Sequence, residues 1–256
     1  LAYPVYKTGD GVHPNAHWVI TSYEVARDGL WDTLRSYNWD TVIIDEAHRA
    51  VGATYLAILE HYGCLGPERA DSAVALGVTA TMMRGDDKAL GAVWQDVVHS
   101  RSIAEGIGDG FLVRPRGLHV EVDDLDLSKV KTSGGDYQSG ALGKAIEDSL
   151  APEAIAKAVA EHASTRKILL FAPTIASAEV ISDALSASGR RSAVVHSKLG
   201  GGPRKAVLDD FRADSEGVLC NATLMTEGVD IPSIDCVIPR MTKLPGFYIQ
   251  QVGRGL

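Results

Sequence analysis

The stretch Val42-Ile43-Ile44-Asp45-Glu46-Ala47-His48 decides the fold, because an apolar run ends there in two adjacent carboxylates. A short apolar run of this kind is typical of a strand buried in a parallel sheet. Open α/β sheets bind ligands at the carboxyl ends of such strands. One of the two carboxylates could hold Mg²⁺ there, and its neighbour could accept a proton from an attacking water. Taken alone, an Asp-Glu pair is more often a solvated acidic turn.

Two segments further along the chain also place polar residues after apolar runs. Thr79 and Thr81 follow a strand-like run, and their hydroxyls can bond a neighbouring carboxylate or backbone group. After the apolar run 217–220, Gly228 permits a close backbone approach and Asp230 offers a carboxylate on a loop. Ordinary strand and turn chemistry is the alternative for the two threonines.

The end of the chain supplies a basic side chain between two glycines. In the run 248–256, Arg254 lies between Gly253 and Gly255, which leave its guanidinium free to reach a phosphate. A flexible basic tail is the alternative for this segment.

In this order, the segments resemble the motifs of the superfamily 2 helicases and translocases, specifically the DEAH-type, DNA-directed branch. The matches are Asp45 to His48 for motif II, Thr79 to Thr81 for motif III, Thr226 to Asp230 for motif V, and Gln250 to Arg254 for motif VI. Residues 19–23 look like motif Ib and residues 168–174 like the strand of motif IV. The resemblance covers nearly the whole chain. It implies two RecA-like α/β domains with doubly wound parallel sheets, the first of them incomplete, which clasp ATP between them.

The resemblance also implies roles in ATP hydrolysis. Asp45 would hold the Mg²⁺ on the β- and γ-phosphates, and Glu46 would orient and deprotonate the attacking water. Arg254 would be an arginine finger supplied by the second domain. His48 would bond to Gln250 across the cleft.

Further roles concern coupling, the nucleotide and the nucleic acid. Thr79 and Thr81 would couple the two sites, and Gly228 and Asp230 would lie at the nucleotide, with Asp230 near the ribose. Four hydroxyl residues would contact the tracked strand: Thr21, Ser22, Thr174 and Thr226. Helix capping or turn bonding is an equal alternative for any one of these four hydroxyls.

Two departures from the helicase pattern bear on activity. No Gly-Lys-Thr or Gly-Lys-Ser precedes Asp45, so the phosphate-binding loop of motif I is absent from the sequence. The glycine cluster at 200–205 has the wrong spacing and cannot replace it. The chain also stops at Leu256, one residue before the final arginine of motif VI. We therefore expect an internal segment of a longer ATP hydrolase, and we expect this segment to be inactive alone.

Composition sets further bounds. The net charge of −8 is the main objection to nucleic-acid binding, which usually leaves a basic footprint. A narrow channel lined by backbone amides and hydroxyls would answer that objection. The three cysteines form no CxxC pair, which fits a reducing compartment. No apolar run reaches the roughly 18 residues that cross a bilayer. We expect a cytoplasmic protein that has DNA as its partner, with RNA less favoured and no membrane.

Alternating strand and helix patterns predict a first domain over 1–114 and a second over 115–256. Residues 88–98 favour a helix, residues 117–122 a strand, and residues 123–140 an exposed loop. Other expected strands lie near 18–21, 42–45, 75–79, 167–172, 192–196, 217–221 and 236–239. Other expected helices lie near 54–62, 152–162, 176–188 and 203–212.

We interpret the chain as part of an ATP-dependent DNA helicase or translocase that uses Mg²⁺. Two alternatives remain. One is a nucleic-acid-binding or regulatory module that keeps the fold without turnover. The other is a metal-dependent hydrolase in which Asp45, Glu46 and His48 bind one metal.

Overall fold

The computed structural model describes residues 5–7, 18–22, 31–34, 36–66, 72–80, 90–222 and 231–256. The chain divides into two compact units, Leu1–Val98 (unit 1) and His99–Leu256 (unit 2). The division therefore comes earlier than the expected boundary at residue 114. Helix α4 (Ile103–Gly108) and the segment after it belong to unit 2, where the Val113 N–H donates to the Leu256 carbonyl at 3.1 Å.

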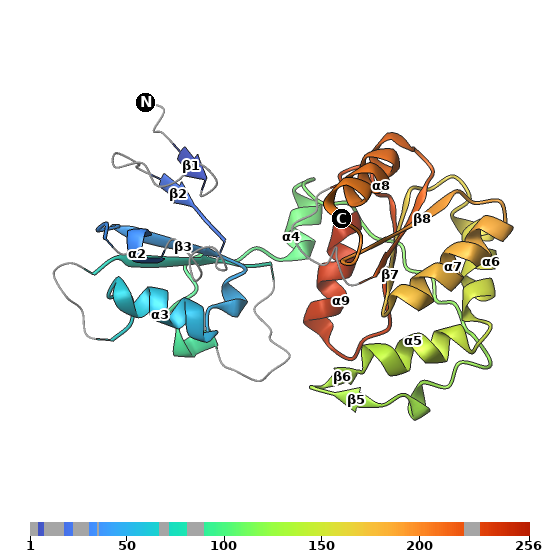
Figure 1. Cartoon of the computed structure of the whole chain (residues 1–256), viewed down its shortest axis with the longest axis horizontal. Helices are drawn as coiled ribbons and strands as arrows, with labels where there is room; N and C mark the ends of the chain where they lie inside the picture. The colour runs from blue at the N-terminus through green and yellow to red at the C-terminus, as the bar shows by residue number, and fades with distance from the viewer. Residues whose placement is uncertain are drawn as a thin grey trace. The chain divides into compact units, whose positions relative to one another are not determined.

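Unit 2 is built on a parallel sheet of strand order β10-β7-β9-β8 (Figure 1). Its strands are β7 (Ile168–Ala172), β8 (Ser192–His196), β9 (Val218–Ala222) and β10 (Cys236–Ile238). Its main helices are α5 (Ser139–Glu147), α6 (Ala151–His162), α7 (Ile175–Ala187), α8 (Gly201–Ala213) and α9 (Pro245–Val252). This arrangement confirms the expected α/β class with a doubly wound parallel sheet.

The composition of β7 follows from burial on both faces of this sheet. Successive side chains of a strand point to opposite faces. Ile168 and Leu170 lie in the core formed with α5, α6 and α7, whereas Leu169 and Phe171 lie in the core formed with α8. A strand covered by helices on both sides must therefore be apolar along its whole length.

Unit 1 contains two parallel strand pairs: β1 (Val5–Lys7) with β2 (Trp18–Ile20), and β3 (Thr41–Asp45) with β4 (Val74–Val78). Its described helices are α2 (Trp31–Leu34) and α3 (Ala53–His61). Ile44 is buried in a core with side chains of α3, but Ile43 and Leu76 are 49% and 42% exposed. One face of the β3–β4 pair therefore lies in a core, while the other leaves hydrophobic side chains on the surface.

Two sequence predictions of secondary structure were wrong. The described part of the helix expected over 88–98 holds only a 3-10 turn, η4 (Leu90–Ala92). Trp94, which follows this turn, donates a side-chain hydrogen bond to the Ala47 carbonyl. Residues 117–122 form no strand. Their apolar alternation favoured one, but Leu118 and Val120 are exposed and the segment has no partner strand. Alternation predicts an amphipathic strand only where another strand accepts its hydrogen bonds.

The segment 123–140, expected to be an exposed loop, is partly docked. It contains a 3-10 turn, η5 (Leu127–Lys129), and a hairpin of β5 (Thr132–Ser133) with β6 (Asp136–Tyr137). Gly134 and Gly135 form the turn with φ of 59° and 81°, values that glycine adopts without strain. Asp136 is only 7% exposed. The hairpin therefore buries a charged side chain instead of standing free in solvent.

The other expected strands and helices lie close to their predicted bounds. Helices α2, α4, α5 and α9 have no counterpart among the predicted helices. None of the described helices is long and apolar enough to cross a membrane.

Two glycines of α5 provide a matched test of the packing in unit 2. A Cβ at Gly143 would lie 2.5 Å from Thr174 Oγ1, whereas a Cβ at Gly140 would meet nothing within 4 Å. We expect Gly143→Ala to lower the free energy of unfolding of unit 2 by about 1–3 kcal/mol through overpacking. Gly140→Ala should raise it by about 0.5–1 kcal/mol, because alanine favours the helix.

Urea unfolding followed by circular dichroism measures both variants. Tryptophan fluorescence is the internal control, because all four tryptophans, Trp18, Trp31, Trp39 and Trp94, lie in unit 1. Equal stabilities for the two variants would contradict the close contact between α5 and the start of α7.

Candidate functional site

The two carboxylates of unit 1 lie where β3 ends, beside the end of β4. Asp45 pairs with Val78 in the parallel register, so Thr79 follows immediately at the same edge of the sheet. Asp45 is exposed, and its Oδ1 accepts a hydrogen bond from the Glu46 N–H at 2.9 Å. The expected meeting of the two strand ends is therefore present within unit 1.

Glu46 has an unusual backbone conformation. Its φ and ψ are 50° and 53°, and it is the one non-glycine residue with a positive φ in the part of the chain that the structure describes. Such a conformation costs about 1–3 kcal/mol and persists where the surroundings enforce it, often at functional sites. Its Oε2 is buried and accepts no hydrogen bond from any described residue. Glu46 therefore offers a carboxylate oxygen with unused capacity as an acceptor.

His48 links the turn after β3 to the end of β4. Its Nδ1 lies 2.9 Å from Thr79 Oγ1 and 3.4 Å from Glu46 Oε2, and its side chain is only 12% exposed. Which of the two groups donates to the other depends on the imidazole tautomer. The segments that resemble motifs II and III thus contact each other through His48 and Thr79. The bond from His48 to Gln250 stays a prediction, because these residues belong to different units.

Trp94 fixes the same turn, although no motif marks it. Its Nε1 donates to the Ala47 carbonyl at 3.0 Å. Its ring lies over Gly77 of β4, where a Cβ would come within 2.6 Å of a ring carbon and 2.7 Å of Ala47 Cβ. Trp94 and Gly77 therefore hold the turn after Glu46 against the strand pair. An isolated tryptophan gave no sequence signal for this role.

In unit 2, the 3-10 turn η6 (Gly253–Gly255) carries Arg254 directly after α9. A fully buried glutamine anchors this helix. Gln251 Oε1 accepts from the Arg240 N–H at 2.9 Å, and Gln251 Nε2 donates to the Phe247 carbonyl at 3.3 Å. Its neighbour Gln250 is partly exposed. The glutamine that anchors α9, Gln251, is thus the residue after Gln250, which was expected to bond to His48.

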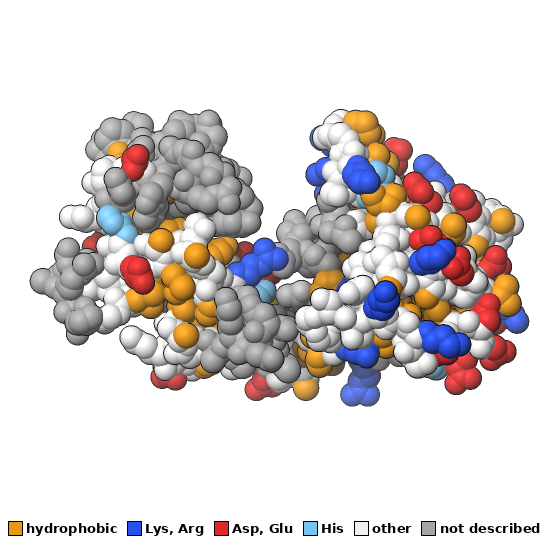
Figure 2. All heavy atoms as spheres, turned by 60° about the horizontal axis from the view of Figure 1, so that its bottom comes forward, with side chains coloured by type: hydrophobic (Ala, Val, Ile, Leu, Met, Phe, Trp, Pro, Cys, Tyr) orange, Lys and Arg blue, Asp and Glu red, His pale blue; other side chains and the backbone are white. Residues whose placement is uncertain are grey.

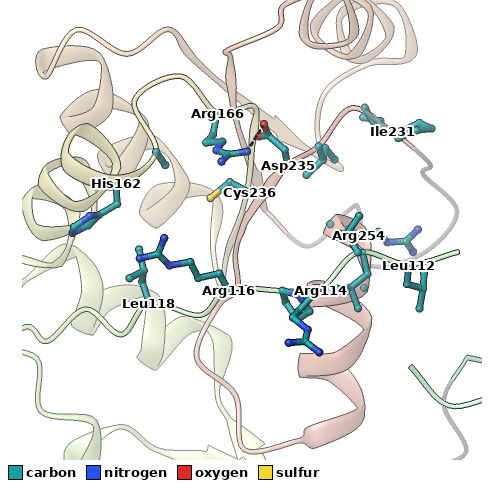
Figure 3. Close-up of a pocket in the computed structure, with 18 of the residues that line it drawn as sticks. Leu112, Arg114, Arg116, Leu118, His162, Arg166, Ile231, Asp235, Cys236 and Arg254 are labelled. Atoms are coloured by element: carbon teal, nitrogen blue, oxygen red, sulfur yellow. Dashed lines mark hydrogen bonds and ion pairs between the residues drawn. The ribbon is translucent and has the colours of Figure 1, made fainter. Parts of the chain in front are cut away.

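Arg254 lines a cavity of about 970 Å³ that lies wholly within unit 2 (Figure 3). The cavity is also lined by Arg114, Arg116 and Arg166, against one carboxylate, Asp235. That carboxylate pairs with Arg166 at 3.3 Å. Guanidinium groups bind phosphate and carboxylate through their fork of donors. The surroundings of Arg254 therefore suit an anionic group.

The hydroxyl residues expected to contact nucleic acid have different surroundings. Thr21 and Ser22 are exposed after β2, and Thr21 Oγ1 donates to the Ser22 carbonyl at 3.1 Å. Thr174 is the N-cap of α7, where its Oγ1 accepts from the Ser177 N–H at 3.0 Å and donates to Glu147 Oε1 at 3.2 Å. The structure thus gives Thr174 the capping contact named as its alternative.

Four predicted site residues lie outside the described residues: Thr81, Thr226, Gly228 and Asp230. Within the described ranges, no group of three or more His, Cys, Asp or Glu side chains could hold a metal ion.

The family described as the helicase conserved C-terminal domain matches residues 150–256. The chain is 31% identical over 231 residues to IRC3 of Saccharomyces cerevisiae, named as an ATP-dependent helicase, covering 87% of this chain and 33% of that protein. It is 33% identical over 223 residues to irc3 of Schizosaccharomyces pombe, named as a mitochondrial ATP-dependent helicase, covering 86% and 36%. The chain therefore spans about a third of the length of these relatives.

A solved structure of the ATP-dependent Type ISP restriction-modification enzyme LlaBIII bound to DNA has the same fold. The TM-score is 0.53 at 14% identity, and the match covers 93% of this chain and 18% of that one. At this identity the likeness concerns the fold alone.

Gly77 allows a test of the turn that carries Glu46. We expect Gly77→Ala to lower the free energy of unfolding of unit 1 by about 1–3 kcal/mol, because the new methyl group overlaps Trp94 and Ala47. Gly91→Ala is the matched control, since a Cβ there meets nothing within 4 Å. Urea unfolding followed by tryptophan fluorescence reports on unit 1. A Gly77→Ala variant as stable as the control would contradict the packing of Trp94 on β4.

Proposed function

Because the chain belongs to the superfamily 2 helicases, we propose that it is the part of an ATP-dependent DNA helicase or translocase that contains the DEAH motif and the arginine of motif VI. The observation that carries this proposal is the conformation and environment of Glu46. Its strained backbone, its buried Oε2, which accepts no hydrogen bond from the described residues, and its place at the edge of a parallel sheet favour a catalytic carboxylate.

In the proposed reaction, Glu46 accepts a proton from the water that attacks the γ-phosphate of ATP. A general base needs an acceptor oxygen that other donors do not already use. Glu46 Oε2 meets this requirement, with His48 Nδ1 near it at 3.4 Å. His48, held by Thr79, keeps the Glu46 side chain in place beside the strand end.

Asp45 fits the role of a Mg²⁺ ligand. Mg²⁺ is usually bound by one or two carboxylates, with phosphate oxygens and waters completing its shell. Asp45 is an exposed carboxylate at the carboxyl end of a parallel strand, so its oxygens can be reached by a nucleotide. When bound, Mg²⁺ would neutralise charge on the β- and γ-phosphates.

Arg254 would act on the charge that develops on the transferred phosphoryl group. Arg254 lines a cavity that Arg114, Arg116 and Arg166 also line, which supports an anionic neighbour for it. His48 and Gln250 would then couple the two units during hydrolysis. Thr81, Gly228 and Asp230 keep their expected roles as proposals.

DNA as the partner rests on the likeness of residues 45–48 to the DEAH-type branch. Exposed Thr21 and Ser22 fit contacts to a sugar-phosphate backbone without adding positive charge. On the face seen in Figure 2, Lys and Arg side chains of unit 2 alternate with Asp and Glu. A narrow track of hydroxyls and amides fits the mixed charge of this face better than a broad basic surface would. The cytoplasmic location stays a prediction, and one relative is named as mitochondrial.

Replacing Glu46 tests the proposal directly. In the natural helicase that contains this chain, we expect Glu46→Gln to abolish ATP turnover and leave the Kd for ATP nearly unchanged. The amide keeps the size of the side chain but cannot accept the proton. Steady-state hydrolysis and calorimetric binding measure the two quantities. Glu60→Gln, on the exposed side of α3, is the matched control. An equal loss of binding and turnover would make Glu46 a binding residue, and unchanged turnover would favour the non-catalytic module.

Arg254 supplies a second test in the same protein. We expect Arg254→Ala to slow hydrolysis by a factor of about 10³ or more, the effect typical of an arginine finger. Arg212→Ala, on the exposed surface of α8, should leave the rate unchanged. A loss of less than about tenfold would remove Arg254 from the finger role.

A further inference from the structure

A buried carboxylate in the β5–β6 hairpin binds the segment that leads into α9. Asp136 Oδ2 accepts hydrogen bonds from Arg240 Nη2 at 2.7 Å and from Thr242 Oγ1 at 2.9 Å. Asp136 Oδ1 accepts from the Lys243 N–H at 2.8 Å. The Asp136 and Arg240 side chains are only 10% and 11% exposed. Three donors from residues 240–243 therefore converge on one buried carboxylate.

This carboxylate is well satisfied in its charged form. Burial alone would raise the pKa of Asp136, but the Lys243 N–H and the other donors, with the Arg240 charge, lower the pKa below its usual value. Arg240 Nη1 also donates to Ser139 Oγ at 3.0 Å, at the first residue of α5. The hairpin and α5 thus hold Arg240 from two sides.

The residues bound to Asp136 in turn contact α9 at both of its ends. Thr242 Oγ1 accepts from the N–H of Leu244, the N-cap of α9, at 3.1 Å. The Arg240 guanidinium lies 4.7 Å from the centre of the Phe247 ring, in the first turn. The Arg240 N–H donates to Gln251 Oε1 in the last turn. Fixing residues 240–243 therefore fixes the whole of α9.

We propose that Asp136 and Arg240, with Thr242, form a positioning lock that sets the orientation of α9 and so the place of Arg254. This inference rests on the proposed function, in which Arg254 acts on ATP. Arg254 follows α9 directly in η6, where a Cβ at the adjacent Gly255 would lie 2.8 Å from Val237 Cγ2 of β10. The turn is thus set by α9 on one side and by the sheet on the other.

The positioning lock affects the rate of ATP hydrolysis by setting the place of Arg254. A misplacement of about 1 Å in a catalytic group can cost about 10² in rate. A buried ion pair specifies one arrangement strongly, because either partner alone would be left as an uncompensated buried charge. Asp136 and Arg240 are accordingly positioning residues, and their loss should reduce kcat while the KM for ATP is preserved.

Hydrogen exchange on the chain itself tests the structural half of the lock. Thr242→Val removes a donor to Asp136 and the acceptor for the Leu244 N–H at nearly constant shape, and Asp136→Ala removes the carboxylate. We expect the amides of residues 246–252 in α9 to exchange about tenfold faster in Thr242→Val and faster still in Asp136→Ala, with the amides of α7 unchanged. Asp209→Ala breaks exposed pairs with Lys205 and Arg212 on α8 and should change neither region.

Two outcomes would overturn this half of the proposal. Unchanged exchange in α9 would show that the lock does not hold the helix. Equal acceleration in α9 and α7 for Thr242→Val would mean that Thr242 contributes only to global stability. The mild variant keeps the test valid even if Asp136→Ala fails to fold.

Kinetics in the natural helicase tests the functional half. We expect Thr242→Val to lower kcat about 10- to 100-fold with an unchanged KM for ATP. The double variant Thr242→Val/Arg254→Ala should be no slower than Arg254→Ala, because the lock acts through Arg254. Additive losses would overturn the proposal. If Arg254→Ala leaves the rate unchanged, the proposed function of Arg254 fails, and the exchange experiment still decides whether the lock holds α9.

Discussion

Parallel strands run in the same direction, so neighbouring strands of such a sheet end at the same edge. They can therefore be joined only by crossover connections. Much of the candidate site depends on this constraint. In unit 1 it brings Asp45, at the end of β3, beside Thr79, which follows β4. In unit 2 it places the ends of β7, β9 and β8 at one edge, where Ala222 of β9 pairs with Ala172 of β7 and with His196 of β8. Residues far apart in the sequence are thereby brought together without any interaction specific to them.

Each unit also has a turn pressed against its sheet, and in each unit a glycine permits the contact. Gly77 leaves room for Trp94 and Ala47 over β4, and Gly255 lies against Val237 of β10. The two turns are reinforced differently. In unit 1, Trp94 donates a hydrogen bond to the Ala47 carbonyl in the turn after β3. In unit 2, the turn η6 follows helix α9, which Asp136 and Arg240 hold. Neither reinforcement lies within the motifs that carry the chemistry.

Because the contacts that reinforce the two turns lie outside the motifs, only part of the structure could be predicted from the sequence. The run Ile168–Ala172 predicted a buried strand because it is apolar at every position. Residues 117–122 predicted a strand wrongly, because alternation contains no information about a partner strand. The Gly134-Gly135 pair is a hairpin signal that the loop interpretation overlooked. Pro245 in the first turn of α9 is likewise a recognised helix start.

In the candidate site, too, a motif could identify some residues, whereas other contacts arise only from the fold. Asp45, Glu46 and His48 are adjacent in sequence, so a motif could identify them. The burial of Asp136 could not be predicted, because its partner Arg240 lies 104 residues further along the chain. Trp94 acts on Ala47 across a separation of 47 residues. Contacts at such separations follow from the fold, and a single sequence gives no direct signal for them.

The backbone of Glu46 shows how stability and function compete at this site. Glycine would adopt φ of 50° and ψ of 53° without strain. A glycine there would also remove the carboxylate, and with it any general base at this position. The cost of about 1–3 kcal/mol for a left-handed glutamate is offset by the surroundings that enforce it. These are the Glu46 N–H bond to Asp45 Oδ1 and the fixed turn under Trp94. In the proposed reaction, the turn must present a carboxylate at residue 46. The strain persists because the backbone conformation alone would favour glycine, which has no side chain.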